Sequence, residues 1–473
     1  MILNARLADS RLFLPLISTA PCVLRDSHSA LSVSTYVYGW SMPNPTGKNG
    51  HTVYAYPDPS KLLSDFLEWE MEGLTTKEQM ARFEKKYSPI KRTKFFALKK
   101  ASGVETVRKN TMSLPQKVQA ILDIKAEDIT GQWGVAQVKS RLARRHLFIS
   151  RDIIRVVLHA YFDHEFDHRF YSIKKKRGPH RTSLRALGPW HQEHADGHEK
   201  LAEQALDMGG GVSFPIYGTR DQYTGWLHNL ELRPDVRHAT NMVHYYLDLV
   251  ESRESDRVSV TMIFDKGTET AEVLKVHRDL RLEAAPDYTV EDWPPTIQLR
   301  SVHNTPIEGL WRWKRQGEGL NVRAVLERGR DAGFFNPNDP LAVSTLYWVF
   351  CPLIQSRLDA FRDYHNHKRT RFDKTKANPS GVTPRQALEC PETMDPPGLD
   401  CSITVSTESI QRWRLMYGGE QARQQARRFF SEEFEREANA AYESIGKPEI
   451  NLTTAWNVYR SILLEIYRRR DVI

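Results

Sequence analysis

The order of strand-like and helix-like segments between residues 211 and 300 constrains this chain more than any other feature of its sequence. The segments are a strand at 211–220, a strand at 225–232, a helix at 238–252, a strand at 257–264, a helix at 268–282, a strand at 296–300 and a long helix from about 305. The hydrophobic spacing changes between the two-residue period of strands and the 3.6-residue period of helices. Strands interleaved with helices in this order predict a mixed α/β layer, a sheet flanked by helices.

Helical patterns continue on both sides of this layer. In the N-terminal part, Thr75 is placed as the N-cap of one helix. Ser88 and Pro89 predict the start of the next, with serine at the N-cap and proline at the first helical position. A second pair of helices is predicted at 135–145 and 151–161.

Ser150 is placed to cap the last of these helices. Two short helices joined by a turn, the second of them basic, outline a helix-turn-helix. The same outline also occurs in all-α domains that bind nothing. We predict a DNA-binding, all-α region of this type, with contacts from Lys139, Arg141, Arg144 and Arg145.

Composition favours a polyanionic partner and a reducing compartment. The net charge is +8 and the pI is about 9.1, which suits nucleic acid, although many basic proteins do not bind it. The four cysteines form no Cys-x-x-Cys pair, so neither disulfides nor a zinc finger is expected. No apolar run reaches the roughly 18 to 20 residues of a membrane span, so no membrane partner is expected.

Two segments bear on localisation. The basic run Lys174, Lys175, Lys176 and Arg177 suits DNA phosphates or a nuclear import signal, and otherwise a solvated charged stretch. We expect a nuclear protein. The first forty residues also fit a transit peptide, and Met42 is an alternative start.

Changes of pattern divide the chain into six predicted parts. These are a disordered tail at 1–56, a helical helix-turn-helix-like DNA-binding region at 57–172, a basic linker at 173–188, a mixed α/β core at 189–372, a Pro-rich connection at 373–400 and a C-terminal helical region at 401–473. The C-terminal helices have the pattern of a docking or assembly module.

Asp265 is the first candidate for a chemical role. It directly follows an apolar strand, and Lys266 and Gly267 let the chain turn away, which presents the carboxylate at a sheet edge. Cleavage of a phosphodiester with two divalent cations needs several carboxylates that converge from separate elements. The structural alternative is a common Asp-x-Gly turn.

Glu308 is the second candidate. Thr305 and Glu308 form a capping box, with Pro306 at the first helical position, so a purely structural role also explains this glutamate. Arg312 and Arg315 follow on the same helix face, where they could hold DNA phosphates behind a metal-binding carboxylate. The structural alternative is a salt-bridged exposed face.

Asp196 is the third candidate, in a polar segment. His194, His198 and Glu199 around it permit a zinc site on a helix, but Gly197 disfavours a helix there and no third ligand is evident. The segment before Asp196 is more polar than a buried strand should be. Glu193 and Asp221 are therefore kept as alternatives to Asp196.

Three segments of the sequence resemble the Asp, Asp and Glu segments of the integrase core of retroviral integrases and related transposases. They are Ala195-Asp196-Gly197, Phe264-Asp265-Lys266-Gly267-Thr268-Glu269, and His303-Asn304 followed by Ile307-Glu308. The run from Tyr364 to Arg369, with Thr383-Pro384 and Ala387-Leu388, is similar to the stretch that closes such cores. Residues 190–388 are most similar to the integrase-core proteins found in fungal genomes.

The resemblance implies a ribonuclease H-like fold, Mg²⁺ or Mn²⁺ as cofactor and catalysis of DNA cleavage followed by strand transfer. It assigns Asp196, Asp265 and Glu308 as the catalytic metal ligands. Further DNA contacts are expected from His303, Asn304, Arg312, Lys314 and Arg315, beside the basic run at 174–177. We expect DNA as partner and a homo-oligomer assembled on it.

Two other functions are compatible with the same sequence. The chain could be a non-catalytic, domesticated DNA-binding protein on the same fold, which would need the basic helices but no metal. It could also be a ribonuclease H-like nuclease that cuts without joining.

Overall fold

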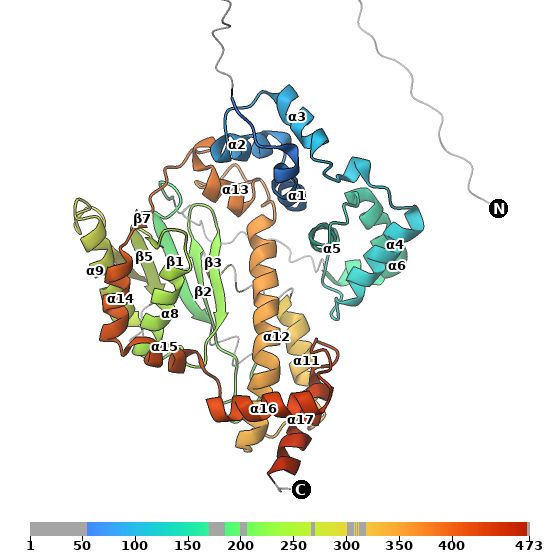
Figure 1. The fold of residues 1–473 in the computed structure, drawn as a ribbon, viewed down its shortest axis with the longest axis vertical. Helices are drawn as coiled ribbons and strands as arrows, with labels where there is room; N and C mark the ends of the chain where they lie inside the picture. The colour runs from blue at the N-terminus through green and yellow to red at the C-terminus, as the bar shows by residue number, and fades with distance from the viewer. Residues whose placement is uncertain are drawn as a thin grey trace, which may run out of the picture. The chain divides into compact units, whose positions relative to one another are not determined.

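The computed structural model describes residues 54–169, 185–198, 206–265, 270–299, 307, 309, 311 and 318–470 (Figure 1). Residues 1–53 lie outside them, so the disordered tail stays a prediction. Most of the predicted basic linker lies outside them too, including Lys174, Lys175, Lys176 and Arg177. The proposed domain boundaries likewise stay predictions.

A five-stranded sheet forms the centre of the α/β layer (Figure 1). Its strands are β1 (Gln192–His198), β2 (Ile216–Asp221), β3 (Leu227–Leu232), β5 (Thr261–Asp265) and β6 (Thr296–Leu299), in the order β3-β2-β1-β5-β6. β1, β2 and β3 pair antiparallel, whereas β1, β5 and β6 pair parallel. The predicted mixed sheet flanked by helices is confirmed, and its strand order is that of the ribonuclease H-like fold.

The predicted strand at 257–264 is divided. Its first part, β4 (Arg257–Val258), leaves the main sheet and pairs with β7 (Ile403–Thr404). Its second part is β5. The two parts of the predicted strand are both extended, but they pair with strands of two different sheets.

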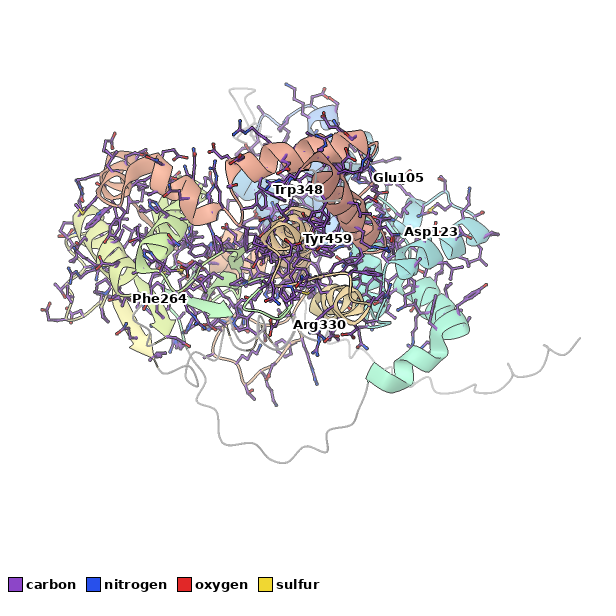
Figure 2. All side chains as sticks on the ribbon, turned by 90° about the horizontal axis from the view of Figure 1, so that it is seen from below. Glu105, Asp123, Phe264, Arg330, Trp348 and Tyr459 are labelled. Atoms are coloured by element: carbon purple, nitrogen blue, oxygen red, sulfur yellow. The ribbon has the colours of Figure 1, made fainter. Side chains whose placement is uncertain are left out.

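Helices cover both faces of the sheet, and adjacent residues of one strand reach different cores. Ile216 lies in a hydrophobic cluster with α11 (Glu318–Asp331) and α12 (Pro340–His367), whereas Tyr217 lies in a cluster with α8 (Ala239–Glu251) and α9 (Ala271–Ala284). This is the alternation expected of a strand buried on both sides. We call them the α12 cluster and the α8 cluster; Figure 2 labels one member of each, Tyr459 and Phe264.

The C-terminal residues complete these two clusters. α14 (Thr407–Met416) packs in the α8 cluster, and α16 (Glu432–Ser444) and α17 (Ala455–Arg469) pack in the α12 cluster. In α17 the Trp456 indole nitrogen donates to the Val325 carbonyl oxygen at 2.7 Å. A Cβ atom on Gly329 would lie only 1.9 Å from the Trp456 ring, so the close approach requires glycine there. The C-terminal helices, predicted as a docking or assembly module, therefore pack within the chain through part of their apolar residues.

The first part of the predicted C-terminal helical region is divided into separate helices. Gly418 and Gly419 have φ angles of 96° and 67°, which L-residues with a side chain rarely adopt, and they end α14 before α15 (Gly419–Arg427) begins. α15 is held on α8 by ion pairs from its arginines to the buried Asp248.

The N-terminal residues form six helices around two further clusters. They are α1 (Leu63–Glu72), α2 (Thr76–Lys86), α3 (Arg92–Ala101), α4 (Leu114–Ala126), α5 (Val135–Arg144) and α6 (Arg151–Arg169). Thr75 caps α2 in a capping box, as predicted. Ser150 Oγ accepts a hydrogen bond from the Ile153 amide at 3.4 Å, which agrees with its predicted capping role.

The predicted start of α3 at Ser88-Pro89 is wrong, because α3 begins at Arg92. The Tyr56 hydroxyl donates to the Pro89 carbonyl oxygen at 2.8 Å, and Glu84 accepts from the Ile90 amide at 3.3 Å. Contacts with distant side chains therefore replace the helical hydrogen bonds at these residues.

A buried ionic junction joins α1 and α2 to α13 (Pro384–Glu389). Glu72 pairs with Arg82 at 2.8 Å and with Arg385 at 2.7 Å, and the Glu72 and Arg82 side chains are only 2% and 4% exposed. His367, at the end of α12, lies 3.5 Å from the same carboxylate. Charges removed from water in this way need partners on every side, so the junction fixes these elements to one another.

The run from Tyr364 to Arg369 connects this junction to the sheet. The Asn366 side chain accepts from the Leu227 amide at 2.8 Å and donates to its carbonyl oxygen at 2.9 Å. His365 lies 2.9 Å from the Gly225 carbonyl oxygen. One turn of α12 thus holds the β2–β3 hairpin, and the next residue contacts the ionic junction.

Among the described residues, no helix combines the length and the apolar character needed to cross a membrane.

We predict that Arg82→Met lowers the free energy of unfolding by about 3 kcal/mol, because removal of one member of a buried ion pair leaves an uncompensated charge. Arg385 still faces Glu72, which keeps the loss at the lower end of the usual range. Urea unfolding followed by tryptophan fluorescence measures it. Arg468→Met, which breaks an exposed pair with Glu465, is the control and should leave the curve unchanged. Equal shifts in the two variants would contradict the role of the junction.

Candidate active site

Asp196 and Asp265 lie on neighbouring parallel strands at the same level. The pairing of β1 with β5 joins residues that are 69 apart in the sequence, such as Gln192 with Thr261 and His194 with Ile263. Asp196 and Asp265 are also 69 apart, and Asp265 is the last residue of β5. Paired strands are roughly 5 Å apart, so the same register continued for two more residues would set these two predicted residues side by side.

Both carboxylates point to the same face of the sheet. Their strand neighbours Ala195 and Phe264 are buried in the α8 cluster, and successive residues of a strand point to opposite faces. Asp196 and Asp265 therefore face the side of the α12 cluster, and both are half-buried. Two carboxylates on one face of neighbouring strands could bind the same metal ion.

Trp311 holds the first of these carboxylates. Its indole nitrogen donates to Asp196 Oδ2 at 2.9 Å, and its ring is buried in the α12 cluster. Gly218 of β2 is the cross-strand partner of Asp196. A Cβ atom on Gly218 would lie 3.3 Å from the Trp311 ring and 3.1 Å from Leu230, so the glycine leaves the space in which the indole reaches Asp196. Trp311 was not among the predicted site residues, and its position three residues after Glu308 was the available signal.

The third predicted ligand and several predicted DNA contacts belong to one segment, residues 303–315. Glu308 lies outside the described residues, and so do the predicted DNA contacts His303, Asn304, Arg312, Lys314 and Arg315. Ile307, Gly309 and Trp311 are helical, which agrees with the helix predicted from about Thr305. Within the described part of the chain no group of three His, Cys, Asp or Glu side chains could hold a metal ion, and that part does not include Glu308.

The two alternatives to Asp196 have structural roles. Glu193 is fully buried and pairs with Arg253. Burial raises the pKa of Glu193, and the Arg253 guanidinium opposes that rise. Asp221 is also fully buried, where it accepts hydrogen bonds from the backbone amides of Trp190 and Thr224 at 2.8 and 2.7 Å. Each carboxylate is occupied within the fold, which leaves Asp196 as the candidate on β1.

The helical zinc site considered for this segment is wrong in its geometry. Residues Gln192–His198 form a strand. The His194 ring is 1% exposed, and its Nε2 atom lies 2.6 Å from Gln222 Oε1.

The cations predicted on α5 mostly contact other parts of the protein. Arg144 pairs with Asp363 of α12, and Arg145 pairs with Glu127. The Arg141 guanidinium lies 3.6 Å from the centre of the Trp133 ring, and burial lowers the pKa of Arg141 to about 10. Lys139 is half-exposed. Their contact with DNA stays a prediction.

Comparison with known proteins agrees with the fold. Residues 188–394 match the family described as "Integrase core domain". No curated protein matches the chain. The matched residues include the whole five-stranded sheet and end shortly after α13. Over residues 188–394 the chain is therefore similar to an integrase core domain, which supports a relationship to the integrase/transposase superfamily.

Proposed function

We propose that the chain is a DDE-type integrase or transposase that cleaves DNA and joins the freed end to a target strand. Asp196, Asp265 and Glu308 are its catalytic carboxylates in this proposal. The observation that supports it is the β1–β5 register, which pairs residues 69 apart in the sequence, the same interval that separates Asp196 from Asp265. The integrase core domain implies DNA as the partner.

The donor set fits Mg²⁺ or Mn²⁺. Hard cations prefer oxygen ligands, and Mg²⁺ is held by one or two carboxylates together with water and phosphate. Asp196 and Asp265 supply such oxygens from two fixed strand ends. The chemistry that these ions supply when bound is activation of the attacking oxygen and stabilisation of the leaving oxygen.

The proposed reaction has two balanced steps. A water oxygen bonds to the phosphorus of the scissile phosphodiester, and the 3′-oxygen leaves as a hydroxyl. That hydroxyl oxygen then bonds to a phosphorus of the target strand, whose own 3′-oxygen leaves and takes up a proton. The protein's part is mainly to position the strands and to complement the developing negative charge.

Trp311 supports the assignment of Glu308. Residues three apart on a helix share a face, and the Trp311 side chain reaches Asp196. A helix that continues through Ile307, Gly309 and Trp311 would direct the side chain of residue 308 toward the same strand end. We therefore propose Glu308 as the third ligand and Trp311 as a residue that positions Asp196.

The proposal includes assembly and location. DNA would be contacted by the cations that follow Glu308 and by the basic run at 174–177. We propose that a homo-oligomer assembles on DNA in the nucleus, because the joining step needs two DNA partners held together.

We predict that Asp265→Asn lowers Mg²⁺-dependent DNA nicking by at least about 100-fold, the usual cost of losing one preorganised electrostatic group, and leaves DNA binding intact. A nicking assay and a binding assay on the same duplex measure the two effects. Asp287→Asn, at an exposed aspartate outside the site, is the control. Undiminished nicking by Asp265→Asn would refute the assignment, and nicks without joined products would identify a nuclease instead.

A second prediction concerns Trp311. Trp311→Phe keeps an aromatic ring but removes the N–H that holds Asp196, so Mn²⁺ should bind about 10- to 100-fold more weakly, as on loss of other partners of metal ligands. Calorimetric titration of Mn²⁺ measures this, beside Glu308→Gln, which should weaken binding further.

The matched control for Trp311→Phe is Trp413→Phe. Trp413 is a buried tryptophan of the α8 cluster whose indole nitrogen makes no hydrogen bond. Both variants lose the same atoms from a hydrophobic cluster, and only one loses a bond to a carboxylate. Equal Mn²⁺ affinities in the two variants would exclude the positioning role.

A further inference from the structure

α3 carries a dense and exposed positive charge. Residues 91–109 contain seven Lys or Arg residues and a single acid, Glu105 (Figure 2). Six of these cations are exposed, among them Lys91, Arg92, Lys94 and Lys100, and none of these four pairs with an acid in the described part of the chain. Like charges gathered without counter-charges repel one another, so the surface favours an anionic partner.

The buried side of α3 determines which of its residues face outward. Phe95 and Leu98 are buried in a cluster with Phe66 of α1 and Phe83 of α2, and the Phe66 and Phe95 ring centres are 5.5 Å apart. Arg92, Phe96 and Lys100 follow one another at four-residue spacing, which places them in one row along the helix. The charges are therefore presented by a packed helix.

An aromatic ring lies within this row. Phe96 is 44% exposed, and the Arg92 guanidinium lies 5.7 Å from its ring centre. Lys94 lies 5.8 Å from the centre of the Tyr56 ring. Cations interleaved with exposed aromatic side chains are typical of nucleic-acid-binding surfaces.

The other basic helices of the N-terminal part differ from α3 in how their charges are used. Lys86 of α2 pairs with Asp65, and Lys99, on the inward side of α3, pairs with Glu70. On α5, Arg144 and Arg145 pair with acids, as described above. Among the described residues, exposed cations without an acidic partner also lie on α2 (Lys77 and Lys85) and on α6 (Arg151 and Arg155), but α3 and the residue before it carry the larger group of four.

We infer that the outward face of α3 binds the phosphate backbone of duplex DNA, through Arg92, Lys94 and Lys100 with Lys91 beside them. The choice of DNA rests on the proposed function. A lipid surface fits less well, because an interfacial helix buries a broad apolar face in the membrane, whereas the apolar face of α3 is already buried within the protein.

Salt dependence of DNA binding tests the inference. Affinity falls as salt rises, and each phosphate neutralised by a cation makes the slope of log K against log salt more negative by about 0.9. The full chain would be titrated in EDTA with a fluorescent duplex of about 30 base pairs, between 50 and 200 mM salt. The triple variant R92Q/K94Q/K100Q should bind DNA more weakly, and its slope should be less negative than that of the wild type by about 2 to 3.

The matched control is R436Q/K447Q/R468Q. It removes the same charge from exposed positions on the C-terminal helices and the turn between them, so it should retain the wild-type slope. Because substitutions at exposed positions seldom affect folding, both triple variants should keep the wild-type melting temperature. The single variant K100E adds a charge that repels phosphate, so its slope should also be less negative than that of the wild type.

The outcomes are distinct. A wild-type slope in R92Q/K94Q/K100Q, or an equal decrease in both triple variants, overturns the inference. The inference is also overturned if R92Q/K94Q/K100Q loses binding to phosphatidylserine vesicles but binds DNA as the wild type does. Since EDTA removes the metals, a chain that never cleaves DNA can still support the inference, which separates its failure from failure of the proposed function.

Discussion

The parallel pairing of β1 with β5 determines where Asp196 and Asp265 lie, and the proposed chemistry depends on it. A shift of this register by one residue would turn one of the two carboxylates to the opposite face. Several contacts oppose such a shift. Glu193 is held from the α8 side by Arg253, and Asp196 is held from the α12 side by Trp311. β1 is thus fixed by a partner on each face, one three residues before Asp196 and one at Asp196 itself.

The same contacts explain why β1 was the hardest strand to predict. β2, β3 and β5 have apolar residues at the spacing of buried strands, and the sequence predicted them. β1 contains Gln192, Glu193 and His194, and two of these three are buried. Their burial is compensated by Arg253 and Gln222, which are distant in the sequence. Because these partners are distant in the sequence, the local pattern around β1 did not show that its polar residues could be buried. The resemblance of Ala195-Asp196-Gly197 to a known motif could be seen without that information.

Other differences have the same physical origin. The Ser88-Pro89 pair has the residues of a helix start, but Tyr56 takes the Pro89 carbonyl oxygen and delays α3. The break between α14 and α15 was visible as Gly418-Gly419, yet the helical spacing continues on both sides of it. The position of α17 depends on Gly329, because only a glycine lets the Trp456 ring come so close. Helices themselves could be predicted from periodicity; their ends and their partners are decided by tertiary contacts.

The packing also relates the two proposed functional surfaces. Catalysis by positioning requires that bound DNA be held in a fixed geometry relative to the carboxylates. α3 packs on Phe66 of α1 and Phe83 of α2, and these two helices supply Glu72 and Arg82 to the buried ionic junction. The junction reaches Arg385 of α13 and His367 of α12, one residue beyond the asparagine that holds β3. DNA held by α3 would therefore be connected to the sheet through buried and partly buried contacts. This continuity gives the buried charges a role beyond stability, because an ion pair specifies the relative placement of two elements more narrowly than an apolar contact does.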